Sequence, residues 1–296
     1  MRPVGAFLKW AGGKARLASQ IVDRVDDESL TIERYHEPFV GGGAVFFALR
    51  DEGLLKAASL SDGNEALIEA YKVVRDDRAK LLRHLGEHQR KYRSSEGGSQ
   101  AKYYYKVRDR TRPTSPAGRA ARLFFLNKTC FNGLYRVNSQ GRFNVPHGRH
   151  PNPRILDKEG LRDASEALQG TQIQSMDFEE ACASAEPGDF VYLDPPYQPL
   201  SATSAFTKYT SGDFGTADQE RLRDAFDDLT TRGVHALLSN SEHPDVRELY
   251  DGYSLEEVPM GRNINSKATE RSAITELLIS NIDALTLLKR LAKRSK

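Results

Sequence analysis

An acid, two prolines and an aromatic residue follow directly on a run of apolar residues within the segment Asp189–Tyr197. Proline has no backbone N–H, so Pro195 and Pro196 must end a central strand at Asp194. The Asp194 carboxylate and the Pro195 carbonyl are then two adjacent acceptors, which suit the two hydrogens of an exocyclic amine. Tyr197 is placed to stack on the ring that carries this amine. An ordinary strand-end turn with an aromatic cap uses the same residue types, so other motifs must decide.

A second candidate site is the glycine turn Gly41–Gly43, which follows the segment Glu37–Val40 and precedes the helical run Val45–Leu49. Glycines let the backbone approach a ligand closely. About 20 residues later Asp62 ends another strand-like run, where a carboxylate can accept both hydroxyl groups of a ribose. Together these features predict a cofactor that carries a nucleoside. NAD remains possible, but no glycine stands where the third glycine of the dinucleotide fingerprint belongs, so S-adenosylmethionine fits better.

Two further motifs fit such a pocket. The segment Phe7–Lys14 contains the only tryptophan of the chain, Trp10, in a glycine-rich turn, and it ends in Lys14, which can pair with a carboxylate. A helix-capping turn with a packed indole explains this segment at least as well. Asp177 and Phe178 place an acid and an aromatic ring after a third strand-like run, as an adenine pocket requires.

The 296 residues are 39% hydrophobic and 28% charged, which indicates a soluble globular chain with room for one large α/β domain and a subdomain. The sequence has no apolar run of membrane-spanning length and no signal-peptide pattern. Cys130 and Cys182 cannot form a disulfide framework, and no Cys/His cluster has zinc spacing. We therefore expect a cytoplasmic protein with no structural metal.

Short apolar runs predict strands, and most of them are separated by segments with helical periodicity. This alternation favours a largely parallel sheet covered on both faces, and the last two runs are close enough to form an antiparallel hairpin at one edge. The expected strands are Tyr35–Phe39, Ala57–Ser61, Gln172–Met176, Phe190–Leu193, Val234–Ser239, Ser254–Val258 and Ile274–Ser280. Helical patterns are clearest at Glu65–Arg75, Arg78–Arg93, Ala117–Phe125, Leu161–Leu168 and Asp218–Thr231.

Strand signals are absent between residues 65 and 170, which predicts a mostly helical insertion over residues 65–170 in a domain formed by residues 1–64 and 171–296. Between Arg83 and Arg154 basic residues outnumber acidic ones, and aromatic residues lie among them. This combination is typical of nucleic-acid binding. Taken alone, a solvated basic face explains the region equally well.

Taken in order, these motifs resemble those of the Dam-type, D12-class DNA adenine-N6 methyltransferases, whose recognition domain lies between the cofactor and catalytic motifs. The most specific match is in the insertion, where Asn132–Arg136 and Gly141–Gly148 resemble the target-reading hairpin and loop of that family. One departure is Gly43, where relatives often carry another small residue. The matching segments span nearly the whole chain: Phe7–Lys14, Glu37–Gly43, Asp62, Asn127–Gly148, Asp177–Phe178, Asp194–Tyr197 and Arg271–Asn281.

The resemblance implies a Rossmann-like α/β methyltransferase sheet of about seven strands, one edge strand antiparallel, with a DNA-recognition insertion. It implies that the enzyme transfers a methyl group from S-adenosylmethionine to a flipped adenine in double-stranded DNA, with GATC as the expected target, without a metal or an obligate protein partner. The implied site residues are catalytic Asp194, Pro195, Pro196 and Tyr197; cofactor-binding Trp10, Lys14, Phe39, Gly41, Asp62, Asp177 and Phe178; and DNA-binding Asn132, Leu134 and Arg136.

Two other functions share parts of this pattern. A methyltransferase that acts on RNA or on a protein glutamine amide would use the same acid-Pro-Pro-aromatic motif, since a glutamine amide also offers two N–H groups. A DNA-binding regulator with a vestigial methyltransferase site would retain the basic insertion. The insertion favours nucleic acid, its match over Asn127–Gly148 favours duplex DNA, and the intact Asp62 and Asp194–Tyr197 motifs favour an active enzyme.

Overall fold

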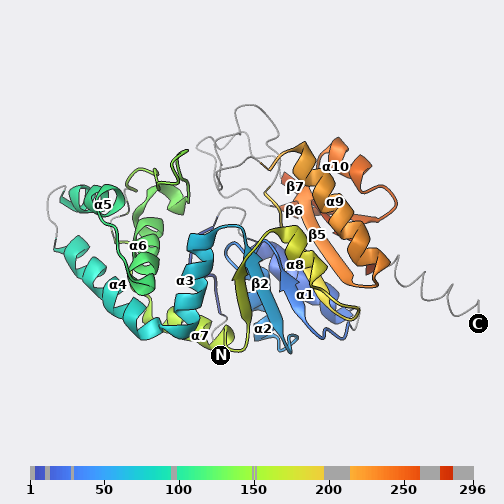
Figure 1. Ribbon diagram of the computed structural model, residues 1–296, viewed down its shortest axis with the longest axis horizontal. Coiled ribbons are helices and arrows are strands. Elements are labelled where there is room, and N and C mark those ends of the chain that lie inside the picture. The colour runs from blue at the N-terminus through green and yellow to red at the C-terminus, as the bar shows by residue number, and fades with distance from the viewer. Residues whose placement is uncertain are drawn as a thin grey trace, which may run out of the picture.

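The fold is built on a single seven-stranded sheet (Figure 1). A computed structural model describes residues 4–10, 14–27, 30–94, 99–148, 150, 152–196, 214–260 and 274–282. Its strands are β1 (Tyr35–Glu37), β2 (Ala58–Asp62), β3 (Gln172–Ser175), β4 (Phe190–Leu193), β5 (His235–Ser241), β6 (Ser254–Met260) and β7 (Ile274–Ser280). Every strand that the sequence predicted is present, with ends that differ by two residues at most.

The strand order is β3-β2-β1-β4-β5-β7-β6. From β3 to β5 all neighbours pair in parallel, whereas β7 runs antiparallel to both β5 and β6. The predicted antiparallel hairpin at one edge is therefore confirmed, with β6 outermost and β7 between it and β5. The predicted α/β class, a largely parallel sheet flanked by helices, is confirmed as well.

Helices cover both faces of the sheet, so the central strand β4 is buried on both sides, and its sequence is continuously apolar. Phe190 and Tyr192 point into one hydrophobic core, and Val191 and Leu193 into the other. Side chains alternate along a strand, so a strand buried on both faces favours apolar residues at every position. The first core includes α1 (Ala15–Asp27) and α2 (Ala44–Asp51); the second includes α8 (Phe178–Ala183), α9 (Thr216–Thr231) and α10 (Pro244–Leu249).

The region between β2 and β3 is helical, as the sequence predicted. It contains α3 (Glu65–Asp76), α4 (Arg78–Arg93), α5 (Ser99–Asp109), α6 (Pro116–Thr129), the short 3-10 helix η1 (Phe131–Gly133) and α7 (Lys158–Ala167). Figure 1 shows α4, α5 and α6 to one side of the sheet. Helix α3 contacts both α6 and strand β3, so the insertion and the sheet share one continuous core. The domain boundaries at residues 65 and 170 remain a prediction.

Four helices of the structure were not predicted: α1, α5, α8 and α10. The last two are six residues each, too short to show a clear period. Helix α5 has three consecutive tyrosines, so its sequence shows no regular spacing of apolar residues. Among the described residues, no helix combines the length and apolarity that a membrane span requires.

The N-terminal segment, residues 4–10, lies between the sheet domain and the insertion. The Phe7 ring stacks on Phe124 of α6 at a centroid distance of 5.5 Å. It also meets Tyr71 of α3 edge-on at 4.7 Å and Phe47 of α2 at 6.0 Å. A single buried ring therefore joins helix α2 of the sheet domain to helices α3 and α6 of the insertion.

Candidate active site

The candidate site lies at the carboxyl edge of the sheet. Because β1, β2, β3 and β4 are parallel, their carboxyl ends meet at the same edge, where open α/β sheets bind ligands. Glu37 and Asp62 end β1 and β2, and Asp177 and Asp194 follow β3 and β4. The antiparallel strand β7 begins at this edge, since its Glu276 pairs with Ser241 near the end of β5.

Three side chains from distant parts of the chain surround the Asp194 carboxylate. The Lys14 ammonium lies 3.2 Å from Asp194 Oδ1 and 2.9 Å from Glu276 Oε2. The Ser239 hydroxyl donates to the same Oδ1 at 2.9 Å. Lys14 is 4% exposed, so this ion-pair cluster is screened very little by water. Asp194 follows β4 directly because Pro195 and Pro196 cannot continue the ladder.

Opposing influences set the ionisation of Asp194. Burial raises the pKa of the carboxyl from its ordinary value to about 6, while the positive charge of Lys14 and the hydrogen bond from Ser239 lower it and the negative charge of Glu276 raises it. The group is consequently ionised for the most part at pH 7. An ionised carboxylate is a pure acceptor of hydrogen bonds.

Beneath Asp194, Glu37 ends β1 in a fully buried position. Tyr35 donates its hydroxyl to Glu37 Oε2 at 2.9 Å. Burial raises the pKa of Glu37 to about 8, and the nearby Asp194 charge acts in the same direction. At pH 7 Glu37 is therefore mainly neutral, and Asp194 carries the negative charge at this point of the sheet.

The glycine turn wraps around the Asp62 carboxylate. Gly41 N–H donates to Asp62 Oδ2 at 3.1 Å, and Asn64 N–H donates to Oδ1 at 2.9 Å. Each oxygen of a carboxylate has two lone-pair sites, so with respect to the described residues one site on each oxygen remains for a further donor. Burial raises the pKa of Asp62 to about 6, with these two N–H groups opposing the rise.

Glycine is required twice in this turn, because Gly41 and Gly43 have φ angles of +46° and +68°. A Cβ atom on Gly41 would lie 2.9 Å from Cδ1 of Trp10, and one on Gly43 would lie 2.6 Å from the Tyr71 hydroxyl. The same hydroxyl donates to the Gly41 carbonyl at 3.1 Å. Gly41 and Gly43 therefore have no room for side chains, because Trp10 and Tyr71 pack directly on the backbone there.

We expect Gly43→Ala to lower the free energy of unfolding by roughly 1–3 kcal/mol, since alanine is strained at positive φ and would contact Tyr71. Thermal or urea unfolding measures the loss. Gly53→Ala is the matched control, because Gly53 has a φ of +73° and nothing within 4 Å of its Cβ position. Equal destabilisation by both changes would show that the contact with Tyr71 contributes nothing.

Aromatic rings form one wall beside the turn. Phe39 stacks on Phe178 with a centroid distance of 5.3 Å and an interplanar angle of 28°. Asp177 is exposed; its carboxylate caps α8 by accepting the Glu179 N–H at 3.0 Å and pairs with Arg221 at 2.9 Å. The Arg221 guanidinium lies 4.8 Å from the centre of the Phe178 ring. The predicted partners Asp177 and Phe178 are therefore both held by Arg221.

Trp10 joins this turn to the insertion. Its indole, packed against Gly41, stacks on Tyr135 at 5.2 Å with an interplanar angle of 24°. Asn127 of α6 fixes the neighbouring backbone, because its Oδ1 accepts Lys9 N–H at 2.9 Å and its Nδ2 donates to the carbonyl of Lys9 at 2.8 Å. The same Nδ2 donates to the Gly133 carbonyl at 2.9 Å. One buried amide thus holds the N-terminal segment against the turn after α6.

Residues 136–144 form a small hairpin. Val137 and Phe143 pair in an antiparallel bridge, and Asn144 N–H donates to the Arg136 carbonyl at 3.0 Å. Arg136 Nε donates to Asn144 Oδ1 at 2.7 Å. Among the described residues this is the only side-chain hydrogen bond of Arg136, so its terminal nitrogens Nη1 and Nη2 are left for an external acceptor.

The other predicted DNA-binding residues precede this hairpin. Asn132 is exposed and is the only described non-glycine residue with positive φ, at 54°. Leu134 is half-buried and packs against the main core. Phe131, also in η1, is 51% exposed, which is unusual for a large apolar ring.

The structure brings the predicted site residues into two adjoining groups. The first group is the glycine turn with Gly41 and, around it, Trp10, Asp62 and Phe39, which stacks on Phe178. The second group is Lys14 and Asp194. Tyr197 lies outside the described residues. Four residues of the site were not predicted from the sequence: Ser239 and Glu276 near Asp194, Asn64 beside Asp62, and Asn127 against the backbone of Lys9. The polar run Ser239–Ser241 at the end of a buried strand could have indicated a site. No local sequence pattern indicated Glu276, because its position depends on the pairing of β7 with β5.

The strand order, the helices on both faces and the acidic strand ends define an α/β methyltransferase fold. Residues 10–264 match the family model of the D12 class N6 adenine-specific DNA methyltransferases, and the chain belongs to this family. The chain is 43% identical to the type II methyltransferase M.MjaIII of Methanocaldococcus jannaschii over 94% of this chain and 99% of that protein.

Other relatives cover similar shares. The type II methyltransferase M1.LlaDCHI of Lactococcus lactis subsp. cremoris is 41% identical over 93% of this chain and 94% of its own length. The DNA adenine methylase of Escherichia coli (strain K12) is 33% identical over 94% of this chain and 95% of its own length. The family resemblance inferred from the motifs is thus confirmed.

Proposed function

We propose that this protein transfers a methyl group from S-adenosylmethionine to N6 of an adenine that is flipped out of double-stranded DNA, with GATC as the target. The observation that carries the proposal is the Asp194 carboxylate, with Oδ1 held by Lys14 and Ser239. Within the described residues, Oδ2 is then the oxygen left to accept a hydrogen from the substrate amine.

The residues around the glycine turn fit S-adenosylmethionine. Gly41 has no side chain of its own, so a ligand can approach its backbone closely. Among the described residues Asp62 accepts one hydrogen bond on each oxygen, which leaves one acceptor site on each for the two ribose hydroxyls. Phe39 and Phe178 supply aromatic surface for an adenine, and Asp177 supplies an acceptor for its amino group. The Trp10 indole closes the turn on the side of the insertion.

When bound, S-adenosylmethionine supplies an already activated methyl group, so the protein must prepare the nucleophile. The lone pair of adenine N6 is delocalised into its ring. If Asp194 and the Pro195 carbonyl accept the two N6 hydrogens, the nitrogen can pyramidalise and direct its lone pair at the methyl group. This stabilisation grows as positive charge develops on N6, so it favours the transition state over the ground state.

The target base must leave the duplex to reach this edge, at a cost of a few kcal/mol. Stacking on Tyr197, which follows the two prolines, is expected to return about 1–3 kcal/mol. Asn132, Leu134 and Arg136 face the DNA in this proposal. A contact of Arg136 with guanine is supported by its hydrogen bond to Asn144, which engages Nε and, among the described residues, leaves Nη1 and Nη2 for O6 and N7.

The test is methylation in sequence context. Duplex DNA is incubated with the protein and S-adenosylmethionine and then sequenced for N6-methyladenine. We expect methylation within GATC; methylation at another site would refute that target alone. Labelled cofactor with single-stranded RNA or a glutamine peptide tests the rival substrates, and transfer to these but not to duplex DNA would overturn the proposal. Binding of DNA with no transfer in a single turnover would instead support a regulator with a vestigial site.

Asp62→Ala should raise the dissociation constant of S-adenosylmethionine by tenfold or more, because a charged acceptor of two hydroxyl groups is worth about 1.5–3 kcal/mol. Titration calorimetry measures the change. Asp62→Asn keeps the shape and one acceptor, so we expect a smaller loss. Unchanged affinity in Asp62→Ala would exclude Asp62 as the ribose ligand.

A further inference from the structure

Asp194 is supported by side chains of the strand pair β5–β7. Ser239 lies on β5 and Glu276 on β7, and the register pairs Glu276 with Ser241. Residues two apart on a strand share a face, and directly paired residues project to the same side. Ser239 and Glu276 therefore reach the same carboxylate region from one face of the β5–β7 pair.

The Lys14 ammonium is divided between two carboxylates. It lies closer to Glu276, at 2.9 Å, than to Asp194, at 3.2 Å. Lys14 is 4% exposed and Glu276 is 9% exposed. A buried ammonium is costly without a carboxylate partner. Glu276 therefore supplies a fixed anchor for Lys14 that remains whatever Asp194 binds.

We propose that Glu276 is a positioning residue for methyl transfer: it anchors Lys14, which together with Ser239 engages Oδ1 of Asp194 and directs Oδ2 to the substrate amine. This inference rests on the proposed function. It assigns a reaction-specific task to a glutamate on the antiparallel strand, far in sequence from both the cofactor and the catalytic motifs.

The charges around Asp194 make this proposal testable by pH. Among the described residues, Lys14, Glu276 and the hydroxyl of Ser239 act on it directly. From β1 and β4, Glu37, Tyr35 and Tyr192 also interact with its charge. Of these groups, only Lys14 and Glu276 form the ion pair in question, and they have opposite effects on the ionised form of Asp194.

The experiment measures methyl transfer to a GATC duplex from pH 5 to pH 9. The acidic limb of kcat/KM for DNA is measured at saturating S-adenosylmethionine, so that Asp62, whose pKa is also raised to about 6, is engaged by the cofactor. It then reports ionisation in the enzyme before DNA binds, and we assign it to Asp194. Glu276→Gln removes a negative neighbour and should move this limb to lower pH. Lys14→Met removes the positive neighbour and should move it to higher pH. In Glu276→Gln the plateau of kcat should also fall by about 10- to 100-fold through lost orientation, with KM for cofactor and DNA within a few-fold.

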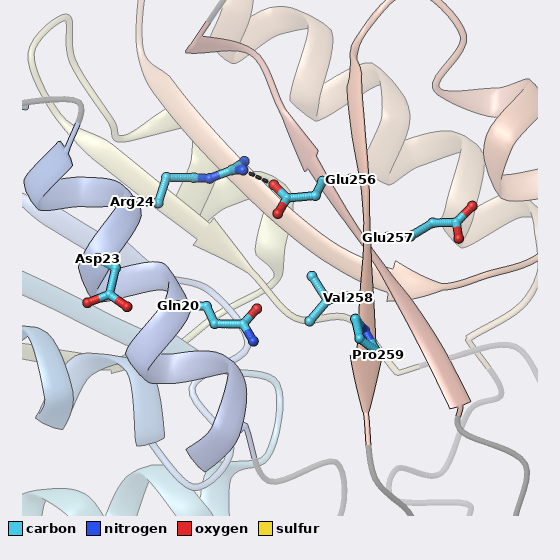
Figure 2. A pocket seen from close by; sticks show the side chains of 7 residues that line it. All are labelled: Gln20, Asp23, Arg24, Glu256, Glu257, Val258 and Pro259. Carbon is cyan, nitrogen blue, oxygen red and sulfur yellow. Dashed lines mark ion pairs between the residues drawn. The ribbon is translucent and has the colours of Figure 1, made fainter.

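A matched control lies on the neighbouring strand. Glu256 of β6 pairs with Arg24 of α1 and is part of a polar pocket between these elements (Figure 2). Glu256→Gln removes the same charge from an ion pair at the surface. It should leave both the acidic limb of kcat/KM and the plateau of kcat unchanged. This control separates the local effect of Glu276 from a general change in charge.

Glu276→Asp is the second variant, in case Glu276→Gln does not fold. It keeps the negative charge, so the acidic limb should not move to lower pH, while the shorter side chain draws Lys14 away from Asp194 and lowers the plateau of kcat severalfold. An unmoved limb in Glu276→Gln, or a full plateau in Glu276→Asp, would overturn the proposal. A wild-type protein that methylates no adenine would instead overturn the proposed function.

Discussion

Asp194→Asn is expected to abolish measurable methyl transfer, with a loss of at least about 10²- to 10³-fold in kcat. The amide keeps the shape of the carboxylate but loses the charge that stabilises a developing positive charge on N6. It can also turn an N–H donor toward the substrate amine, which has no need of one. A single-turnover assay with labelled S-adenosylmethionine measures the methyl-transfer step directly.

The control for this variant is cofactor binding. Asp194 lies beside Lys14 and Ser239 and not in the turn that encloses Asp62. The affinity for S-adenosylmethionine should therefore stay within a few-fold of wild type. Near wild-type turnover in Asp194→Asn would show that Asp194 has no part in methyl transfer. Loss of cofactor binding would show that the substitution disturbs the cofactor pocket instead.

Arg136→Ala should relax the sequence preference, so that sites with one altered base pair are methylated as well. A bidentate arginine–guanine pair contributes about 1–3 kcal/mol of discrimination, so the preference should fall by up to about 100-fold. Methylation rates on GATC and on singly altered duplexes measure this ratio. Asn144→Ala should lower the preference less, because it removes only the acceptor of the hydrogen bond from Arg136 Nε, which orients the guanidinium.

Arg142 offers the comparison for this prediction. It is exposed in the same hairpin, two residues before Asn144. An arginine that contacts only phosphate weakens binding to all sequences alike and lowers its salt dependence. If Arg136→Ala behaves in this way and retains the GATC preference, Arg136 does not recognise a base.

The sequence predicted those parts of the site that depend on local order. Asp62 ends one parallel strand and Asp194 directly follows another, and parallel strands bring their carboxyl ends to one edge whatever lies between them. Gly41 was recognisable because the turn excludes side chains. Glu276 was not predictable in this way, since its position follows from the pairing of β7 with β5, which is a long-range contact.

Helices and buried polar groups show the same difference between features set by local sequence and features set by long-range contacts. Helices α3, α4, α6 and α9 have a regular apolar spacing, and the sequence predicted each of them. Asn127 falls within the apolar run of α6 and has no local sign of its function, because its partners are the backbone of Lys9 and Gly133. Such a residue reveals itself only when segments distant in sequence are seen side by side.

The position of the N-terminal segment bears on attempts to change the sequence preference by exchanging recognition units between relatives. Phe7 packs against both α3 and α6, and Asn127 bonds the backbone of Lys9. A transplanted insertion would thus lose contacts that its own chain supplies from outside residues 65–170. We therefore expect the unit for exchange to be discontinuous and to comprise the insertion together with residues 4–10. Chimaeras that move the insertion alone should fold less stably than either parent.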